Sequence, residues 1–278
     1  MKKLLKTIGL GLSILVLSIQ FSYAAKEQIS EYEKAILSLN WIKPPNSGDI
    51  ANKAKIDLLN DHYFLGEEET KKFLKINGNP ESPENYTLFS AVEGWFAIFS
   101  FSPEGYIKDD EKIDADALLK VLKENNVKAL EERKKEGLPL LYLDGWYTPP
   151  HYDKENNRLE WATKIHDKDN NIIVNYTTRV LGRSGYMNVL LVSEPNTLDR
   201  DIKSFKTALK KFDFNNGERY AEWKEGDKVA AYGLGALVVG GAAAAIASKG
   251  GFKFLWAIAL AAIAGLAGVF KKFFGKKE

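Results

Sequence analysis

The sequence predicts an α+β fold: a mostly antiparallel sheet with two or three packing helices, followed by a C-terminal hydrophobic helical hairpin. Strand-like runs, interrupted by only a few helix-like segments, predict the sheet. Two uncharged apolar stretches near the end of the 278-residue chain predict the hairpin. With 45% hydrophobic and 27% charged residues, the chain is apolar enough to bury a core.

The N-terminal residues 1–24 have the layout of a secretory signal peptide. Lysines precede an apolar run at 8–21, and Ser22 and Ala24 place small residues before a cleavage point. The alternative is an uncleaved signal anchor, although the apolar run is shorter than the roughly 20 residues of a membrane-spanning helix. Both alternatives export the chain. We therefore expect the main domain, residues 25–225, on the outer, periplasmic side of a bacterial cytoplasmic (inner) membrane.

The C-terminal residues 226–278 are expected to anchor the chain in a lipid bilayer. Residues 229–247 and 254–270 are uncharged and apolar, each is about long enough to span, and only a short turn joins them. The lysine-rich tail that follows would then end outside the cytoplasm, against the positive-inside tendency. The favoured explanation is that export of the large upstream domain overrides this tendency. The alternatives are an uncleaved signal that acts as a third span, or a first segment that does not cross fully.

Small residues four positions apart recur in both apolar stretches, as at Ala236 and Gly240 and at Ala261 and Gly265. Such spacing lets helix backbones approach closely in lipid. The favoured interpretation is that the two helices pack on each other. The alternative is homo-oligomerisation through these Ala/Gly-rich helices.

In the first half of the main domain, strand-like runs surround one short helix. Acidic residues begin this helix near its positive end, and Glu93 with Gly94 can form a hairpin turn between two strands. The expected elements are a strand at 54–65, a helix at 67–77, and strands at 86–92 and 95–101.

The clearest predicted helix covers residues 113–137. Asp114 can cap its start and Gly137 can end it, while Asn125 and Asn126 leave open a split into two helices. Turn residues separate the runs that follow. These runs are strands at 138–146, 157–165, 171–182 and 185–194, and a final helix at 199–212.

Charge and residue types exclude several classes of function. A net charge of +2 without a basic stripe argues against a nucleic-acid partner. The chain has no cysteine, so a disulfide or a thiolate metal ligand is excluded. The three histidines, His62, His151 and His166, lie far apart in sequence and lack the paired spacing of zinc ligands. We therefore expect no metal and no other cofactor.

The stretch "GWYTPPHYD", residues 145–153, concentrates the residues that could carry chemistry. His151 beside Asp153, or with Asp144, could act as a general base. No Gly-x-Ser-x-Gly motif accompanies it to supply a nucleophile. Because the catalytic set is incomplete, the favoured prediction is that the protein is not an enzyme.

A structural interpretation of the same stretch is favoured. Pro149 and Pro150 lack backbone donors and restrict the chain, so the segment is predicted to leave a strand edge and form a rigid corner. At such a corner Trp146, Tyr147 and Tyr152 can pack with their polar tips towards water.

Two arginines flank a glycine-containing turn further along the chain. Arg179 and Arg183 could clamp a carboxylate or phosphate. The favoured alternative is that one of them pairs with a cross-strand acid such as Glu160 while the other is solvated. Together with the previous stretch they complete a candidate contact surface, which consists of Trp146, Tyr147, His151, Tyr152, Asp153, Arg179 and Arg183.

Four segments, in order, carry a resemblance to a known family: "WFAIFSFSPEGYIKDDEKIDADALLK", "GWYTPPHYDKENNRLEWA", "VNYTTRVLGRSGYMNVLLV" and "GDKVAAYGLGALVVGGAAA". The chain resembles the bacterial membrane-anchored proteins grouped as domain of unknown function 2167. The resemblance implies an exported domain with a C-terminal anchor, and it implies no activity, substrate or catalytic residue.

Three functional hypotheses follow. The favoured one is an extracytoplasmic binding or scaffold protein that is anchored in the membrane and contacts other envelope proteins. The first alternative is a hydrolase-like envelope enzyme that uses His151 with Asp153 or Asp144. The second is a domain that binds a sugar or lipid headgroup through Trp146, Tyr147 and Trp161.

Overall fold

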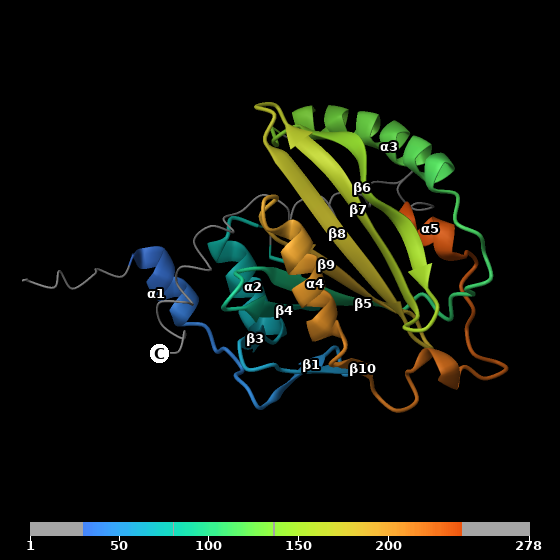
Figure 1. Ribbon diagram of the computed structural model, residues 1–278, viewed down its shortest axis with the longest axis horizontal. Coiled ribbons are helices and arrows are strands. Elements are labelled where there is room, and N and C mark those ends of the chain that lie inside the picture. The colour runs from blue at the N-terminus through green and yellow to red at the C-terminus, as the bar shows by residue number, and fades with distance from the viewer. Residues whose placement is uncertain (1–29, 80, 136, 241–278) are drawn as a thin grey trace, which may run out of the picture.

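A computed structural model describes residues 30–79, 81–135 and 137–240. Within these residues the chain forms an α+β domain built on two antiparallel sheets (Figure 1). The larger sheet has seven strands in the order β3-β4-β5-β9-β8-β7-β6, and the smaller one has three in the order β1-β2-β10. The expected α+β class with antiparallel strands and a few helices is therefore confirmed.

The strands are β1 (Ser47–Ile50), β2 (Ala54–Asp57), β3 (His62–Leu65), β4 (Asn85–Ser90), β5 (Phe96–Ser102), β6 (Leu141–Asp153), β7 (Arg158–Asp167), β8 (Ile172–Leu181), β9 (Tyr186–Val192) and β10 (Phe212–Phe214). The helices are α1 (Glu31–Leu37), α2 (Glu67–Ile76), α3 (Ala115–Lys135), α4 (Leu198–Leu209), the 3-10 helix η1 (Tyr220–Glu222) and α5 (Leu234–Val238).

The β4–β5 hairpin forms where the sequence predicted it. Phe89 pairs with Phe96, and the turn between them contains Gly94 with a φ of 87°. That left-handed conformation is cheap for glycine alone, because other residues place a Cβ against the backbone there. The turn residues therefore set the register of the hairpin.

The stretch 54–65, expected as one strand, is divided between the two sheets. Its first half, β2, alternates buried and exposed residues, whereas β3 is buried at all four positions. A turn closed by the His62 amide and the Leu59 carbonyl (2.9 Å) separates them. The expectation of a single strand was wrong because the polar residues Asn60 and Asp61 turn the chain from one sheet to the other.

Helix α3 is continuous, so the two asparagines do not split it. Asp114 accepts a hydrogen bond from the Ala117 amide (3.0 Å), as expected for a residue that caps a helix. The Asn126 side chain donates to the carbonyl of Leu141 (2.9 Å) and accepts from the amide of Leu143 (3.0 Å). Asn126 thus attaches α3 to the first residues of the edge strand β6.

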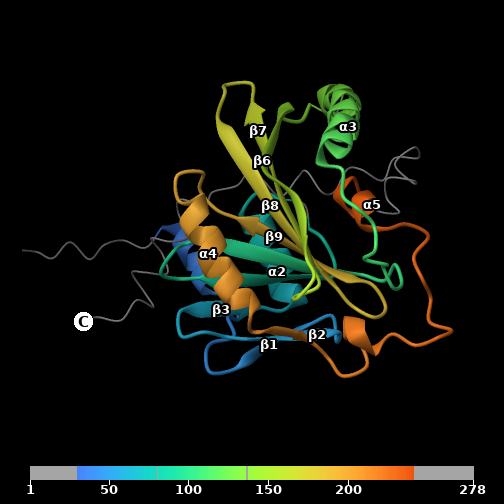
Figure 2. The same cartoon turned by 45° about the vertical axis from the view of Figure 1, so that its right-hand side comes forward.

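One face of the large sheet is covered by α4 and the small sheet (Figure 2). Phe205 of α4 lies fully buried at this interface, with its ring centroid 5.8 Å from Trp95 and 6.3 Å from Tyr176. The final amphipathic helix expected from the sequence is therefore confirmed, and its apolar face packs on the sheet.

The opposite face carries two separate apolar clusters. Helices α1 and α2 pack on β3, β4 and β5, with Phe73 and Phe89 in the centre. Helices α3 and α5 pack on β6, β7 and β8, and Leu122, Leu159 and Leu237 belong to the same buried cluster. The two ends of the sheet therefore have different coverings.

The described chain ends inside the first predicted anchor segment. Residues 229–240 include α5, whose Leu234 and Leu237 are buried against the sheet. No helix among the residues that the structure describes is both long and apolar enough to cross a membrane. The rest of the predicted hairpin, 241–278, and the predicted signal peptide, 1–24, lie outside the described residues.

Candidate functional site

The stretch 145–153 belongs to β6, an outer strand of the large sheet. β6 runs from Leu141 to Asp153 and pairs with β7, with register shifts around Gly145, around Trp146 and between Thr148 and His151. The predicted corner is therefore wrong, because the chain continues as a bulged strand. An edge strand tolerates Pro149 and Pro150 because one side of it needs no backbone donors, and bulges absorb the misfit.

The aromatic residues of this stretch point to opposite faces of the sheet. The Trp146 indole donates to the Ala115 carbonyl of α3 (3.1 Å), and Tyr152 packs into the same α3–α5 cluster. On the other face the Tyr147 hydroxyl donates to Asp199 of α4 (2.7 Å). The predicted contact residues therefore do not form one surface.

A buried carboxylate joins the strands of this region to α4. Glu160 of β7, with 3% of its side chain exposed, accepts from His151 of β6 (3.1 Å) and from the Tyr176 hydroxyl of β8 (3.0 Å). Lys206 of α4 forms an ion pair with the same carboxylate oxygen (2.5 Å). The Glu160 carboxylate thus connects β6, β7, β8 and α4. The sequence predicted no site at this residue. An acid within the apolar strand run "NRLEWATKI" was the signal for it.

The surroundings of Glu160 keep it charged. Burial alone would raise its pKa, but the hydrogen bonds from His151 and Lys206 outweigh burial and lower the pKa to about 2. The hydrogen bond to Glu160 raises the pKa of His151 above its ordinary value, against the opposing effect of burial. The group is therefore an ion pair network at neutral pH, and each of its acidic and basic members is already engaged.

The two histidine–acid pairs that the sequence suggested, His151 with Asp153 and His151 with Asp144, are not formed. His151 pairs with Glu160 rather than with Asp153, whose carboxylate accepts the amides of the β6–β7 turn. Asp144 instead binds the third histidine, His166, at 2.7 Å. The pairing of His151 follows from strand register, since it lies directly opposite Glu160 on the neighbouring strand.

The two arginines occupy unlike environments, and neither pairs with Glu160. Arg179 is buried on the opposite face, with its guanidinium 5.3 Å from the Trp161 ring and 4.8 Å from the Tyr186 ring. Burial lowers its pKa. Arg183 binds Asp227 through two nitrogens, each at 2.7 Å. The expected pairing with Glu160 was wrong because residues 179 and 160 point to opposite faces.

A second polar group lies beneath α4 and was not found from the sequence. His62 is buried beside Trp95 and binds Asp61 (2.9 Å), while the Ser90 hydroxyl donates to Asp61 (3.3 Å) and to Glu93 (3.1 Å). These residue types resemble a catalytic triad, but the serine hydroxyl donates to the acids and not to the histidine. The group joins β3, β4 and the β4–β5 turn. Within the described residues, no three histidine, aspartate or glutamate side chains gather as metal ligands.

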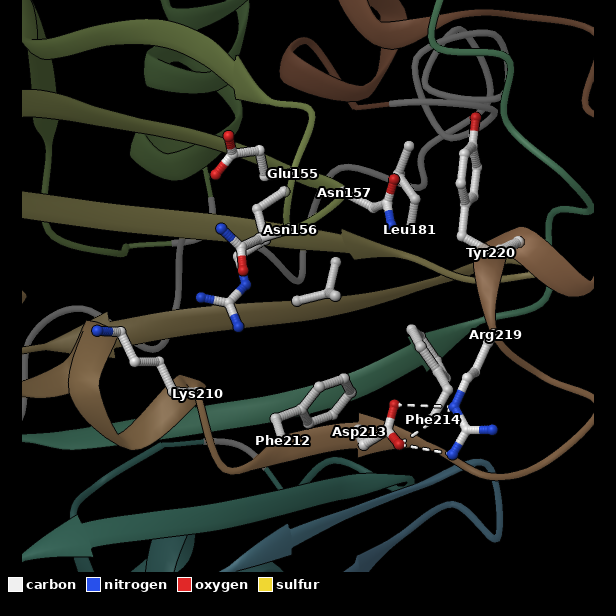
Figure 3. A pocket seen from close by; sticks show the side chains of 13 residues that line it. Glu155, Asn156, Asn157, Leu181, Lys210, Phe212, Asp213, Phe214, Arg219 and Tyr220 are labelled. Carbon is white, nitrogen blue, oxygen red and sulfur yellow. Dashed lines mark hydrogen bonds and ion pairs between the residues drawn. The ribbon is translucent and has the colours of Figure 1, made fainter.

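A pocket of about 330 Å³ opens beside the turn between β6 and β7 (Figure 3). Glu155 and Asn156 of this turn lie on one side of it, and Phe212 and Phe214 of β10 lie on the other. Its lining includes the buried Arg158, the end of β8, residues 210–214 and η1. Polar donors with aromatic walls are typical of ligand-binding pockets.

Comparisons with known proteins add the following findings. The model of one family, described as "Protein of unknown function (DUF2167)", matches residues 43–271. None of the curated proteins matches the chain. Among solved structures, the solution structure of cyanobacterial PsbP (CyanoP) from Synechocystis sp. PCC 6803 is similar at 11% sequence identity and a TM-score of 0.34. The likeness covers 64% of this chain and 92% of that chain.

Proposed function

The chain belongs to the DUF2167 family of proteins of unknown function, and we propose that it is an extracytoplasmic binding or scaffold protein held at a bacterial cytoplasmic membrane. The observation that carries this proposal is the packing of residues 229–240, the first part of the predicted anchor, on the α+β domain. The domain and residues 229–240 are then one continuous structural unit.

Three contacts attach this segment to the domain. Val229 forms a bridge with Tyr106, and the amide of Ala230 donates to the Tyr106 carbonyl (2.9 Å). The Glu111 carboxylate accepts from the Gly235 amide (3.0 Å) in the first turn of α5. Leu237 is completely buried. These contacts support a domain that is held close to the membrane surface rather than on a long tether.

The same packing favours a single membrane crossing. With residues 229–240 in the domain, only the seven residues 241–247 remain of the first apolar stretch, and a spanning helix needs about 20. We therefore propose residues 254–270 as the span that follows a cleaved signal peptide. The lysine-rich tail then ends in the cytoplasm, in agreement with the positive-inside tendency. This revises the topology favoured from the sequence.

Reporter fusions test this topology. We expect alkaline phosphatase to be active when it is fused after Asn215, and a fluorescent protein to be fluorescent when it is fused after Glu278. Phosphatase activity at both positions would contradict the single crossing but leave the domain exported. Phosphatase that is inactive after Asn215 would overturn the extracytoplasmic location.

Binding is favoured over catalysis because His151, Asp144 and Asp153, the acid–base residues that the sequence singled out, and the buried Glu160 are all engaged in structural contacts. Glu160 holds three partners, Asp144 holds His166, and Asp153 holds a turn. The exposed side of β6 and α4, near Tyr147, is then the candidate partner surface.

In-cell photo-crosslinking tests this surface. A photoreactive residue at Tyr147, which is 39% exposed, is compared with one at Ile172, which is 38% exposed at the far tip of the β7–β8 hairpin. We expect a defined set of envelope proteins to be captured from position 147 and not from position 172. The same captured proteins at both positions would contradict a specific surface at Tyr147.

A further inference from the structure

The pocket beside the β6–β7 turn has a donor side chain that the protein leaves partly unused. Arg158 lines this pocket and is 9% exposed. Its Nη2 donates to the Leu209 carbonyl at the end of α4 (2.7 Å), while its buried Nε has no hydrogen-bond partner among the described residues. Burial lowers the pKa of Arg158, and the nearby charges of Glu160 and Asp153 oppose this only in part, without a hydrogen bond from Arg158 to either carboxylate. An anion bound directly to the guanidinium would stabilise its charged form.

The other charges of the lining leave an excess of positive charge. Arg219 is neutralised by Asp213, at 2.7 Å. Lys210 forms no ion pair with a described residue and is exposed at the pocket rim, where Glu155 is the remaining acid. Arg158 and Lys210 together therefore outweigh Glu155, which favours an anionic ligand.

The aromatic walls of the pocket favour a ligand that also has an apolar portion. Phe212 and Phe214 are buried in β10 and line the side opposite the turn (Figure 3). Tyr220 adds a third ring, with its hydroxyl donating to the Ile107 carbonyl (2.8 Å). Aromatic walls beside two cations suit a ligand that carries an apolar group next to its negative charge.

From this geometry we propose that the pocket beside Arg158 binds the phosphate group of a ligand with an apolar portion. The inference rests on the proposed binding function and names its ligand class. Planar guanidinium donors and a lysine ammonium are the usual partners of phosphate oxygens. The phosphate could belong to a soluble ester or to a lipid headgroup, since both present the same chemistry to Arg158 and Lys210.

Arg158 also has a structural role, because it hydrogen-bonds the last residue of α4. A loss of binding on replacing Arg158 would therefore be ambiguous by itself. Lys210 avoids this ambiguity, since its side chain is exposed and carries no contact that holds the fold. Its neighbour Lys211 is also exposed but does not line the pocket, so it provides a matched control.

The test is calorimetric titration of the full-length protein in nanodiscs of zwitterionic lipid with phenyl phosphate, and with inorganic phosphate as the minimal probe. We expect phenyl phosphate to bind more tightly than inorganic phosphate. Lys210→Ala should weaken its binding about five- to tenfold, the usual effect of one exposed charge-assisted contact, and Lys211→Ala should leave it unchanged. Arg158→Lys, which keeps the charge but loses the planar fork and its hydrogen bond to Leu209, should weaken binding about tenfold or more and also lower the melting temperature, so Lys210→Ala is the unambiguous variant.

The lipid composition distinguishes the two sources. If the phosphate belongs to a lipid, phosphatidylglycerol in the discs will compete with phenyl phosphate in the wild type. If the ligand is soluble, the affinity will not depend on the lipid. Absence of phenyl phosphate binding in both kinds of disc, or equal losses in Lys210→Ala and Lys211→Ala, would overturn the phosphate site. Such a failure leaves the crosslinking result at Tyr147 intact, so the failure of this inference and that of the proposed function can be told apart.

Discussion

The two ends of the large sheet are stabilised in different ways. At the β3–β4–β5 end, α1 and α2 cover strands of 4–7 residues with a cluster of aromatic rings, among them Trp41, Phe73 and Phe96. At the β6–β7–β8 end the strands have 10–13 residues, and charged side chains such as Glu160 and Arg179 are buried between the layers. Apolar packing does not depend on pH, whereas a buried ion pair network does. The contrast predicts that a substitution in the aromatic cluster has the same effect on stability at every pH, whereas a substitution at Glu160 has an effect that depends on pH.

The largest predicted loss of stability follows a substitution in the aromatic cluster at the β3–β4–β5 end. Phe73 is fully buried, with its ring centroid 5.2 Å from Phe96 and 6.1 Å from Trp41. Phe73→Ala should lower the free energy of unfolding by about 3–5 kcal/mol, because it removes apolar burial and leaves a cavity. The loss should be the same at pH 4 and pH 7 in chemical denaturation. Val127→Ala, at a residue that is 61% exposed on α3, is the control and should change stability by less than about 0.5 kcal/mol.

The next largest predicted loss of stability follows a substitution of Glu160 at the β6–β7–β8 end. Its pKa is lowered to about 2 from an ordinary 4.5, so its ionised form contributes to stability above pH 4.5 and this contribution is lost as the pH falls towards 2. Glu160→Gln should lower the free energy of unfolding by about 2–3 kcal/mol at pH 7. This loss is smaller than that expected on breaking a fully buried ion pair, because Lys206 and His151 can become hydrated. The wild type and the variant should converge in stability between pH 4.5 and pH 2.

Denaturation curves at several pH values measure this convergence. The exposed Glu225→Gln provides the matched control, since it removes an acid without touching the network. A constant difference between the wild type and Glu160→Gln from pH 7 to pH 2 would contradict the role assigned to the ionised carboxylate.

Local patterns allowed most elements to be predicted from the sequence. The Asp114 cap, the hairpin at Gly94 and the apolar face of α4 depend on neighbours in the chain, and each formed as expected. The pairing of side chains depends instead on register between strands, which no local pattern contains. His151 therefore seemed to belong with Asp153, two residues away, although its partner is Glu160 on the next strand.

The edge strand β6 could not be predicted from the local sequence either. Two prolines normally argue against a strand, so the sequence indicated a corner at Pro149 and Pro150. Their position at the rim of the sheet, where one side needs no donors, becomes visible only in the strand order. The pocket was equally inaccessible to sequence reasoning, because Arg158, Lys210 and Phe212 come together only when the end of α4 meets β7 and β10.

The smallest predicted effect concerns His151, the most exposed member of the Glu160 network. Its hydrogen bond to Glu160 raises its pKa above 6.5, so its contribution to stability is complete below that pH and is lost as the pH rises through the folded-state pKa. Because 48% of the His151 side chain is exposed, His151→Ala should lower the free energy of unfolding by only about 0.5–1 kcal/mol at pH 6, and by less at pH 9. In the Glu160→Gln background the same substitution should have almost no effect at either pH, since the charged partner is gone. An undiminished loss in that background would show that His151 stabilises β6 by packing rather than through Glu160.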